Sequence, residues 1–301
     1  MPRPNFIVAG AARSGTTALA YALGGHPEVF VTEPKEMHFL AYATESPVFS
    51  GPGDSETMAR SLITDPDEYA ALFDGSEGFA ARGEGSVSSL YRPSKALDSM
   101  AKYADPEAKA VVMLREPAAR AHSSYLYLRS RGFEDLDTFE EALGAEEMRA
   151  ELGYHHMWHL RGMSRYGQQL PFFAEALGDR LLILIQEEYV ADQQGTLARV
   201  CEFLDVDSSF SFDTGQSVNR GGEPKSAVFQ NISGALRSNP ATQSLVKTLV
   251  PRKAREMIRV ANLKRPEARP ETMSSLRAEF DVDRRSVEEI LGRRVLAWDA
   301  A

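Results

Sequence analysis

The sequence predicts an α/β protein built on a P-loop-like, doubly wound parallel sheet that is flanked by helices and followed by a helical C-terminal part. Short apolar segments alternate with helical segments along the first two hundred residues, which is typical of this fold class. Two of the apolar segments, AVVMLR and LLILIQ, lack polar alternation, as strands covered on both faces do. A glycine-rich turn, GAARSG, directly follows the first apolar segment.

The expected strands are short. They cover residues 6–9, 29–31, 110–114 and 181–185. Helices are expected between them, at 16–23, 117–131 and 193–204, with further helical stretches in 135–152 and 166–177. Pro117 suits the first turn of its helix. In the 193–204 helix, one face carries the core spacing of Leu197, Val200, Cys201 and Leu204.

Two segments carry turn-forming and polar residues instead. Residues 43–65 are rich in Ser, Gly, Pro, Thr and Asp, and we expect a long surface excursion there. Residues 213–226 form a second polar, glycine-rich loop, after which the sequence is helical to its end without a new strand pattern. There is no internal repeat and no convincing linker, so we expect one domain over residues 1–301.

Composition narrows the function classes. The chain has 301 residues, 43% of them apolar, and no stretch of about 18 uninterrupted apolar residues that would span a membrane. A single cysteine, Cys201, excludes an internal disulfide and suits a reducing cytoplasm. The net charge of −9 argues against a nucleic-acid partner, although a local basic pocket for a small anion remains compatible with it. Nothing in the sequence indicates an oligomeric state.

The glycine-rich turn has the spacing of a phosphate-binding loop. Gly10 and Gly15 match G-x-x-x-x-G, but Thr16 stands where that motif requires lysine, and Thr17 follows. The nearby cation is Arg13, inside the loop. A helix N-terminus preceded by glycines binds anions through free N–H groups, so we expect an anion site here rather than a plain turn.

A second basic element follows the strand at 110–114. Arg115 lies at the end of this strand, where open α/β sheets bind ligands. Ser123 lies eight residues further on, about two turns into the following helix. An arginine fork with a nearby hydroxyl suits a second phosphate. Alternatively, the arginine caps the strand end and the serine faces solvent.

These segments resemble the sulfotransferases. GAARSGTTAL is similar to their 5′-phosphosulfate loop, and VVMLREPAARAHSSY to their 3′-phosphate element. EPKEMHFL and GEGSVSSLY resemble segments of the heparan sulfate and related carbohydrate branch, and SRYGQQLPFF and LGRRVLAWDA resemble later family segments. The resemblance spans nearly all of the chain.

The resemblance implies 3′-phosphoadenosine 5′-phosphosulfate (PAPS) as donor and no catalytic metal. It places Arg115 and Ser123 at the 3′-phosphate. The loop residues around the 5′ group would be Arg13, Ser14, Gly15, Thr16 and Thr17. Arg13 matches a position that is lysine in many relatives; it can neutralise the leaving phosphate oxygen, but it is a poor proton donor.

The resemblance also matches Glu36 to the catalytic glutamate of the carbohydrate branch. Sulfuryl transfer to an alcohol requires a base near the attacking hydroxyl. We expect Glu36 to be that base, with a pKa raised by its apolar neighbours. His38 faces the same way if the segment is extended, and either orients the acceptor or serves as the base itself. Glu33 is a nearby competitor.

Other residues are expected around the substrates. Glu84 and Ser86 line the acceptor pocket by the resemblance, and His155 lies near the acceptor entrance. His155 and His159 have i, i+4 spacing, but a third ligand is missing, so we expect no metal there. In the polar loop, Arg220 and Lys225 are placed to close over the donor or to remain solvated.

The sequence thus favours a sulfotransferase that acts on a hydroxyl of a carbohydrate, lipid or natural product. The acceptor is a small molecule or a glycan. The alternatives are a P-loop nucleotide-dependent kinase of a small molecule, for which the lysine and a magnesium-binding aspartate are missing, and a non-catalytic nucleotide-binding module.

Overall fold

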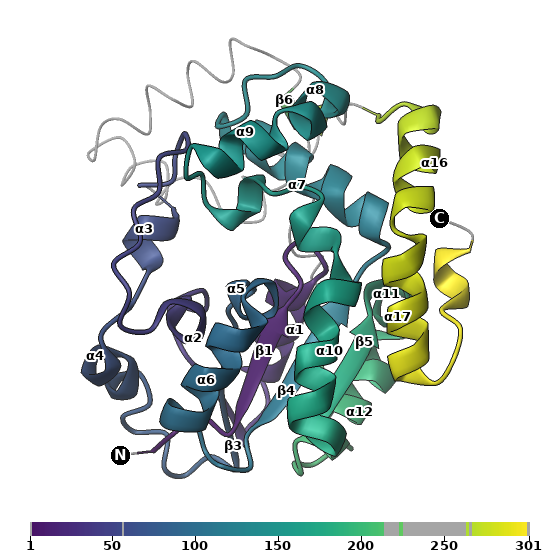
Figure 1. Ribbon diagram of the computed structural model, residues 1–301. Coiled ribbons are helices and arrows are strands. Elements are labelled where there is room, and N and C mark those ends of the chain that lie inside the picture. The colour runs from purple at the N-terminus through teal and green to yellow at the C-terminus, as the bar shows by residue number, and fades with distance from the viewer. Residues whose placement is uncertain (1, 56, 214–222, 225–262, 265–266, 300–301) are drawn as a thin grey trace, which may run out of the picture.

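A five-stranded parallel sheet forms the centre of the molecule, and it confirms the expected fold class (Figure 1). The computed structural model describes residues 2–55, 57–213, 223–224, 263–264 and 267–299. The strand order is β2-β3-β1-β4-β5. The strands are β1 (Phe6–Gly10), β2 (Val29–Val31), β3 (Ala81–Glu84), β4 (Lys109–Leu114) and β5 (Leu181–Ile185).

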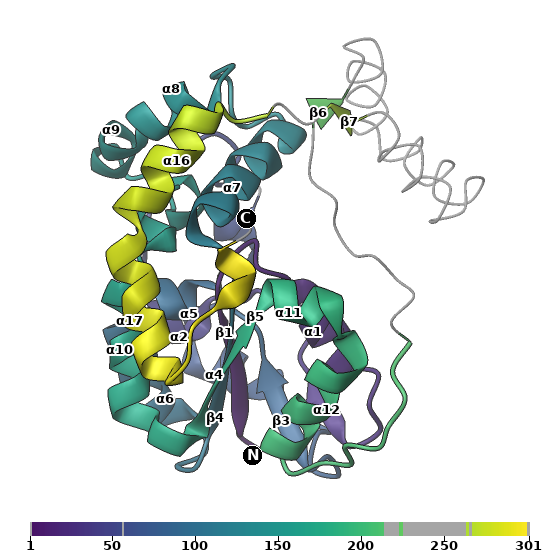
Figure 2. The same ribbon diagram turned by 90° about the vertical axis from the view of Figure 1, so that its right-hand side faces the viewer.

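Helices cover both faces of the sheet, as Figure 2 shows. The first eight helices are α1 (Thr16–Leu23), α2 (Phe39–Tyr42), α3 (Met58–Ser61), α4 (Pro66–Ala71), α5 (Ser88–Tyr91), α6 (Pro93–Tyr103), α7 (Pro117–Arg131) and α8 (Phe139–Gly144). The later ones are α9 (Glu146–Glu151), α10 (Tyr166–Leu177), α11 (Gln186–Ala191), α12 (Gln193–Phe203), α16 (Pro270–Glu279) and α17 (Asp281–Leu291). The described part of the chain also has short 3-10 turns, namely η1 (His156–Trp158), η2 (Gly162–Ser164), η3 (Gly178–Arg180) and η4 (Leu296–Trp298).

The sheet separates two apolar cores. Successive side chains of a strand point to opposite faces. Ala110, Val112 and Leu114 of β4 therefore pack with residues of α6, α10 and α17, whereas Val111 and Met113 pack with α1 and α12. Because both faces of β4 are covered, its sequence shows no polar alternation.

Most expected elements are confirmed. The structure has β2, β5, α1 and α7 with the predicted bounds, and β1 and β4 are each one residue longer. The four apolar residues of the 193–204 helix are buried in the core beside α1, as their spacing predicts. The 135–152 stretch forms two short helices, α8 and α9.

The sequence did not reveal β3, which lies between β2 and β1. Its sequence, ARGE, has two charged residues and a glycine, so it lacks the apolar pattern of the other strands. The glycine is required by packing: a Cβ on Gly83 would lie 2.4 Å from the Phe6 ring. Pairing on both sides still satisfies the backbone of β3, because β1 and β2 both run parallel to it.

Two other expectations were wrong in part. Residues 43–65 are not wholly a surface excursion, because Asp54 is fully buried and Met58 of α3 is 3% exposed. The chain beyond residue 213 is not free of strands, because β6 (Glu223–Pro224) pairs antiparallel with β7 (Leu263–Lys264). The expected helices in the C-terminal part are confirmed by α16 and α17. A single domain over 1–301 stays a prediction.

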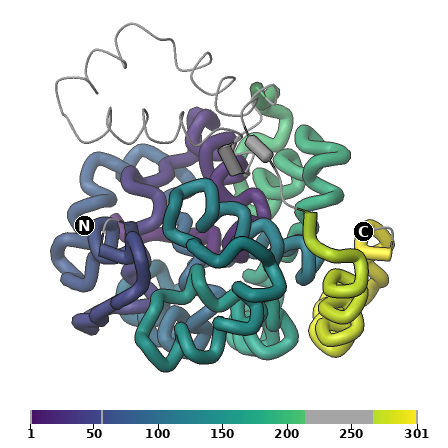
Figure 3. The backbone as a smooth tube through the Cα atoms, turned by 90° about the horizontal axis from the view of Figure 1, so that it is seen from above, coloured from purple at the N-terminus to yellow at the C-terminus, as the bar shows by residue number. Residues whose placement is uncertain are grey.

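The carboxyl ends of the strands lie on one side of the molecule. Figure 3 looks down on this side and shows the chain of α7 to η2, in teal, lying across the centre beside the purple loop that follows β1. Among the residues with described positions, no helix is both long and apolar enough to cross a bilayer.

Candidate active site

The loop between β1 and α1 has the geometry of an anion site. Gly15 caps α1 with φ 94°, a left-handed conformation that favours glycine. A Cβ at this position would also lie 3.1 Å from the Met113 sulfur. Thr16 and Thr17 begin α1, and their N–H groups have no backbone acceptor, whereas the Ala18 N–H donates to the Gly15 oxygen at 3.0 Å. The first turn has no acidic residue. The N-terminus of α1 is therefore open to an anion.

Arg13 supplies a buried positive charge inside this loop. Its guanidinium carbon lies 4.6 Å from the centre of the Tyr127 ring, and its Nε is buried without a hydrogen-bond partner. Burial and, to a lesser degree, the charges of Arg115, Arg120 and Arg131 lower the pKa of Arg13 to about 10, while Tyr127 acts in the opposite direction. An anion beside Arg13 would offset both the burial and the repulsion.

Arg115 lies next to the loop, as the sequence predicted from the strand end. Its Nη1 donates to the backbone oxygen of Arg13 at 3.5 Å. The Glu116 carboxylate is directed to α7, which it caps by accepting from the N–H groups of Ala118 and Ala119. Ser123 lies two turns into α7 and is half-buried. Neither Arg13 nor Arg115 has a carboxylate partner among the described residues.

The Glu36 carboxylate is held by two donors. Its Oε1 pairs with Lys35, and its Oε2 accepts from the Val87 N–H at 3.2 Å. Burial alone would raise the pKa of Glu36, but the charges of Lys35 and His38 and the two hydrogen bonds outweigh it and lower the pKa. The expectation of a raised pKa was therefore wrong, because it considered the apolar neighbours and not these donors. Glu36 is ionised at neutral pH.

His38 is held by two serines. Its backbone φ of 57° shows that the segment is not extended. Its backbone N–H donates to Ser86 Oγ, and its Nδ1 lies 2.9 Å from Ser88 Oγ. Burial lowers the pKa of His38 to about 4 although the charge of Glu36 raises it, so the imidazole is neutral at physiological pH.

Near His38, the carboxyl with a raised pKa is Glu84, at the end of β3. It is fully buried, and one of its oxygens accepts from Ser86 Oγ at 2.6 Å. Burial raises the pKa of Glu84 to about 8, against the lowering effect of the Ser86 hydrogen bond, and the charge of Glu36 adds to the rise. Glu84 thus orients the Ser86 hydroxyl, and this hydroxyl accepts the hydrogen bond from the His38 backbone N–H.

The anion loop, Glu36 and His38 line one cavity of about 450 Å³, the size of a ligand pocket. The lining residues expected from the sequence are Arg13, Thr16, Thr17, Glu36, His38 and His155. Those that the sequence did not indicate are Ala12, Thr57, Met58, Ser61, Val87, Tyr127, Leu128, Ser130, Arg131, Phe133, His156 and Met157. The cavity therefore brings the anion loop and the candidate bases together.

The remaining expected site residues lie outside this lining. Ser14 and Gly15 belong to the loop itself, and Arg115 contacts the loop through Arg13. Glu84 and Ser86 lie beneath His38. Ser123 is on α7, the helix that also carries Tyr127 and Arg131. Arg220 and Lys225 lie outside the described residues.

A buried aspartate, Asp54, holds the cavity wall that His155, His156 and Met157 form opposite the anion loop. Asp54 accepts from the His155 N–H at 3.1 Å and from Trp158 Nε1 at 3.0 Å, and its Oδ1 lies 3.2 Å from His155 Nε2. His155 Nδ1 accepts from the Met157 N–H at 3.0 Å, so both ring nitrogens of His155 are engaged within the fold. Asp54 thereby joins the 43–65 segment to η1.

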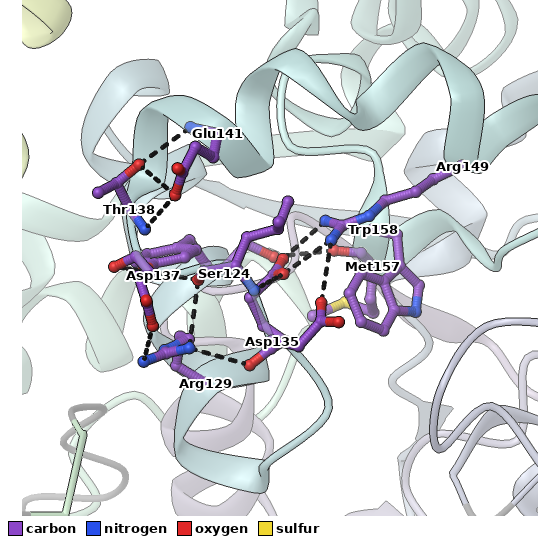
Figure 4. A network of polar contacts seen from close by, with 12 residues as sticks. Ser124, Arg129, Asp135, Asp137, Thr138, Glu141, Arg149, Met157 and Trp158 are labelled. Atoms are coloured by element: carbon purple, nitrogen blue, oxygen red, sulfur yellow. Dashed lines mark hydrogen bonds and ion pairs between the residues drawn. The ribbon is translucent and has the colours of Figure 1, made fainter.

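A second network of polar contacts holds η1 in place, as Figure 4 shows. Arg149 forms two hydrogen bonds with the buried Glu134, at 2.6 and 2.7 Å, and its guanidinium carbon lies 4.8 Å from the Trp158 ring centre. Ser124 of α7 donates to the backbone oxygen of Met157 at 3.2 Å. The wall formed by η1 is thus held by Asp54, Arg149 and Ser124.

Little in the sequence indicated this wall. Tyr127 and Arg131 lie one and two turns beyond Ser123 on α7, and that i, i+4 spacing was the available signal. Met58 and Asp54 lie in a segment whose composition suggested a surface loop. Among the described residues there is no group of three or more His, Cys, Asp or Glu side chains that could hold a metal ion.

Comparisons with known proteins agree with this geometry. Residues 4–210 match the model of a sulfotransferase family. No curated protein matches the sequence. The crystal structure of a sulfotransferase from Alicyclobacillus acidocaldarius is 28% identical, covers 99% of this chain and 100% of its own, and has a TM-score of 0.77.

Two other solved structures are less similar. The sulfotransferase domain of the Synechococcus PCC 7002 olefin synthase is 20% identical with a TM-score of 0.45, covering 93% of this chain and 95% of its own. The sulfotransferase domain of the curacin biosynthetic pathway is 16% identical with a TM-score of 0.48, covering 93% and 98%. The family match over more than half of the chain decides against the kinase and the non-catalytic module: the chain belongs to the sulfotransferase family and is a PAPS-dependent sulfotransferase.

Proposed function

We propose that this enzyme transfers the sulfuryl group of PAPS to a hydroxyl group of a small acceptor molecule in the 450 Å³ cavity. The observation that carries the proposal is that Arg13, Thr16 and Thr17 of the anion loop line the same cavity as Glu36 and His38. A donor anion at the loop and an acceptor hydroxyl at the candidate bases would thus meet in one space.

The loop residues fit the sulfated end of the donor. Arg13 Nε is buried without a partner, and Thr16 and Thr17 present free N–H groups at the start of α1. We assign the 5′ group to Arg13, Ser14, Gly15, Thr16 and Thr17. When bound, PAPS supplies an activated sulfuryl group on a phosphate leaving group. Arg13 stabilises the charge that develops on that phosphate as the bond to sulfur breaks.

The 3′-phosphate is assigned to Arg115 and Ser123. Arg115 contacts Arg13 O and has no carboxylate partner among the described residues, so its charge is available to an anion. Ser123 adds a hydroxyl donor from α7. Arg220 and Lys225 are proposed as further contacts on the sequence argument alone.

Glu36 is proposed as the base that takes the acceptor proton. It is ionised at neutral pH, and its two hydrogen bonds fix its orientation in the cavity wall. His38 is neutral and, with Nδ1 held by Ser88, is proposed to orient the acceptor hydroxyl. Glu84 and Ser86 act through His38 and need not contact the acceptor.

Titration calorimetry with adenosine 3′,5′-bisphosphate tests the donor site. We expect each of Arg13→Ala and Arg115→Ala to weaken binding by at least about tenfold, since a charge-assisted hydrogen bond contributes roughly 1.5–3 kcal/mol. The matched control is Arg199→Ala, which removes an exposed arginine of α12 outside the cavity lining and should leave binding unchanged. Absence of binding to the wild type, or equal binding by all three variants, would refute the assignment.

A further inference from the structure

Arg120 of α7 is a fully buried arginine without a carboxylate partner. Its side chain is 0% exposed. Its Nε donates to Ser164 Oγ at 2.6 Å, its Nη2 donates to the backbone oxygen of Leu160, and its Nη1 is buried without a partner. No carboxylate among the described residues lies within ion-pair distance of it. Because a charge is costly to bury alone, an arginine in this state is unusual in a folded protein.

The other buried arginine of the described chain shows the usual arrangement. Arg149 is 5% exposed, and both of its Nη groups donate to the buried carboxylate of Glu134. Its charge is therefore neutralised inside the fold. Arg120 has only a hydroxyl and a backbone oxygen as acceptors. The fold thus neutralises one buried guanidinium group and leaves the other without a counter-charge.

The groups around Arg120 do not replace the missing carboxylate. Burial and, to a lesser degree, the charge of Arg115 lower the pKa of Arg120 to about 10, while Tyr166 and Glu146 act in the opposite direction. Burial raises the pKa of Tyr166 to about 12, so Tyr166 is a neutral phenol at physiological pH. The Glu146 carboxylate accepts from two backbone N–H groups, at 2.7 and 2.8 Å, and forms no ion pair with Arg120. Arg120 is therefore charged at neutral pH.

Arg120 lies close enough to the two arginines of the donor site to repel them. Burial is the main cause of the lowered pKa of Arg13, and the charges of Arg115 and Arg120 contribute to it. None of these three arginines has a carboxylate partner among the described residues. Charges in an interior of low dielectric constant interact strongly, so the three guanidinium groups together favour an anion at the loop.

We propose that Arg120 is a third charge of the donor site, a buried guanidinium group whose counter-ion is the bound donor and not a carboxylate of the protein. The proposal rests on the proposed function, in which Arg13 and Arg115 meet the two phosphate groups of PAPS. Arg120 attracts these phosphates through space and does not touch them, because its side chain is wholly enclosed. The alternative is that Arg120 only joins α7 to residues 160–164 by its hydrogen bonds.

Titration calorimetry with adenosine 3′,5′-bisphosphate separates these two roles. We expect Arg120→Met, which removes the charge, to raise the Kd by at least about tenfold. Arg120→Lys keeps the charge but cannot repeat the planar fork of the guanidinium group, so it should restore most of the affinity. A role confined to hydrogen bonding predicts the same loss in both variants. Equal losses, or an unchanged Kd in Arg120→Met, overturn the proposal. If Arg120→Met does not fold, Arg120→Gln gives the same comparison.

Ser164→Ala makes the reverse comparison. It removes the acceptor of Arg120 Nε and leaves the charge in place, so the Kd should change by less than about threefold. A loss as large as that of Arg120→Met would assign the effect to the hydrogen bonds and overturn the proposal. Arg165→Met is the matched control, because it removes the same charge where Glu279 and Asp283 already neutralise it. It should leave the Kd unchanged, and a loss equal to that of Arg120→Met would reduce the effect to net charge.

A ligand without phosphates provides the last test. Adenosine, measured by competition, should bind Arg120→Met as it binds the wild type, since it has no charge for Arg120 to attract. An equal loss for adenosine and the bisphosphate would show a distorted nucleotide pocket and overturn the proposal. Absence of bisphosphate binding to the wild type would refute the proposed function itself. Equal binding by the wild type and Arg120→Met refutes only the role of Arg120.

Discussion

Replacing Glu84 by glutamine is expected to stabilise the protein increasingly as the pH rises. Glu84 is fully buried at the end of β3, and burial raises its pKa from 4.5 to about 8. Between these two pH values the folded protein holds a proton on Glu84 that the unfolded chain has released. In this window the contribution of Glu84 to stability therefore falls as the pH increases. Glutamine keeps an oxygen for the Ser86 hydroxyl and has no proton to release.

The magnitude follows from the shift. One pKa unit corresponds to about 1.4 kcal/mol, so Glu84 costs the wild type about 1.4 kcal/mol per pH unit in the window and roughly 5 kcal/mol once the pH exceeds 8. From pH 5.5 to pH 7.5 the difference in unfolding free energy between Glu84→Gln and the wild type should grow by roughly 3 kcal/mol.

Urea unfolding of both proteins at pH 5.5, 6.5 and 7.5 measures this difference. The matched control is Glu77→Gln, which removes one carboxylate from an exposed position outside the site. Its difference from the wild type should stay constant over the range. If the Glu84→Gln difference is also independent of pH, Glu84 is not held protonated by burial, and the reasoning on its environment is wrong.

Three further predictions concern the base, the wall and its support. Glu36→Gln should lower kcat by roughly 10²–10⁴-fold with unchanged affinity for adenosine 3′,5′-bisphosphate. Because the pKa of Glu36 is lowered, the pH–rate profile of the wild type should show no loss of activity on the acidic side above about pH 4.5. A loss of activity that begins near pH 6 would contradict this assignment. Asp54→Ala should lower the unfolding free energy by roughly 1–3 kcal/mol, since the buried His155 loses its partner. The same change should raise the KM for the acceptor more than the KM for PAPS. Equal changes in both KM values would argue against a role of Asp54 in the acceptor wall. Glu134→Gln should cost roughly 3–5 kcal/mol in urea unfolding, because it removes the buried carboxylate partner of Arg149 and leaves the exposed Asp135, at 3.9 Å, as its remaining described carboxylate. A cost below about 1 kcal/mol would show that the buried pair is dispensable.

Local sequence signals predicted the loop after β1 and the helices beside it well. The loop, α1 and α7 are each specified by contiguous residues: glycines that permit left-handed backbone, a proline at a first helical turn and apolar runs of strand length. Arg13 and Arg115 could be placed because each lies next to such a signal, at a loop or at a strand end.

The opposite wall of the cavity could not be predicted in this way. It combines α3, α7 and η1, which are far apart in the sequence. The buried side chain of Asp54 joins the segment of α3 to η1, and Ser124 joins α7 to η1. A buried aspartate and a solvated one look the same in a sequence, because burial depends on what packs above it. The strand β3 was hidden for a related reason, since its neighbours on both sides, and not its own residues, make it a strand.

The amino-acid sequence by itself determined the fold class, the family and the positions of the two arginines at the loop and at the strand end, because these depend on short contiguous patterns. Only the tertiary structure decided the protonation states: Lys35 and Val87 lower the pKa of Glu36, while the same fold buries Glu84 and raises its pKa. Desolvation and neighbouring charges set a pKa through distances in space, and those distances exist only once the chain has folded.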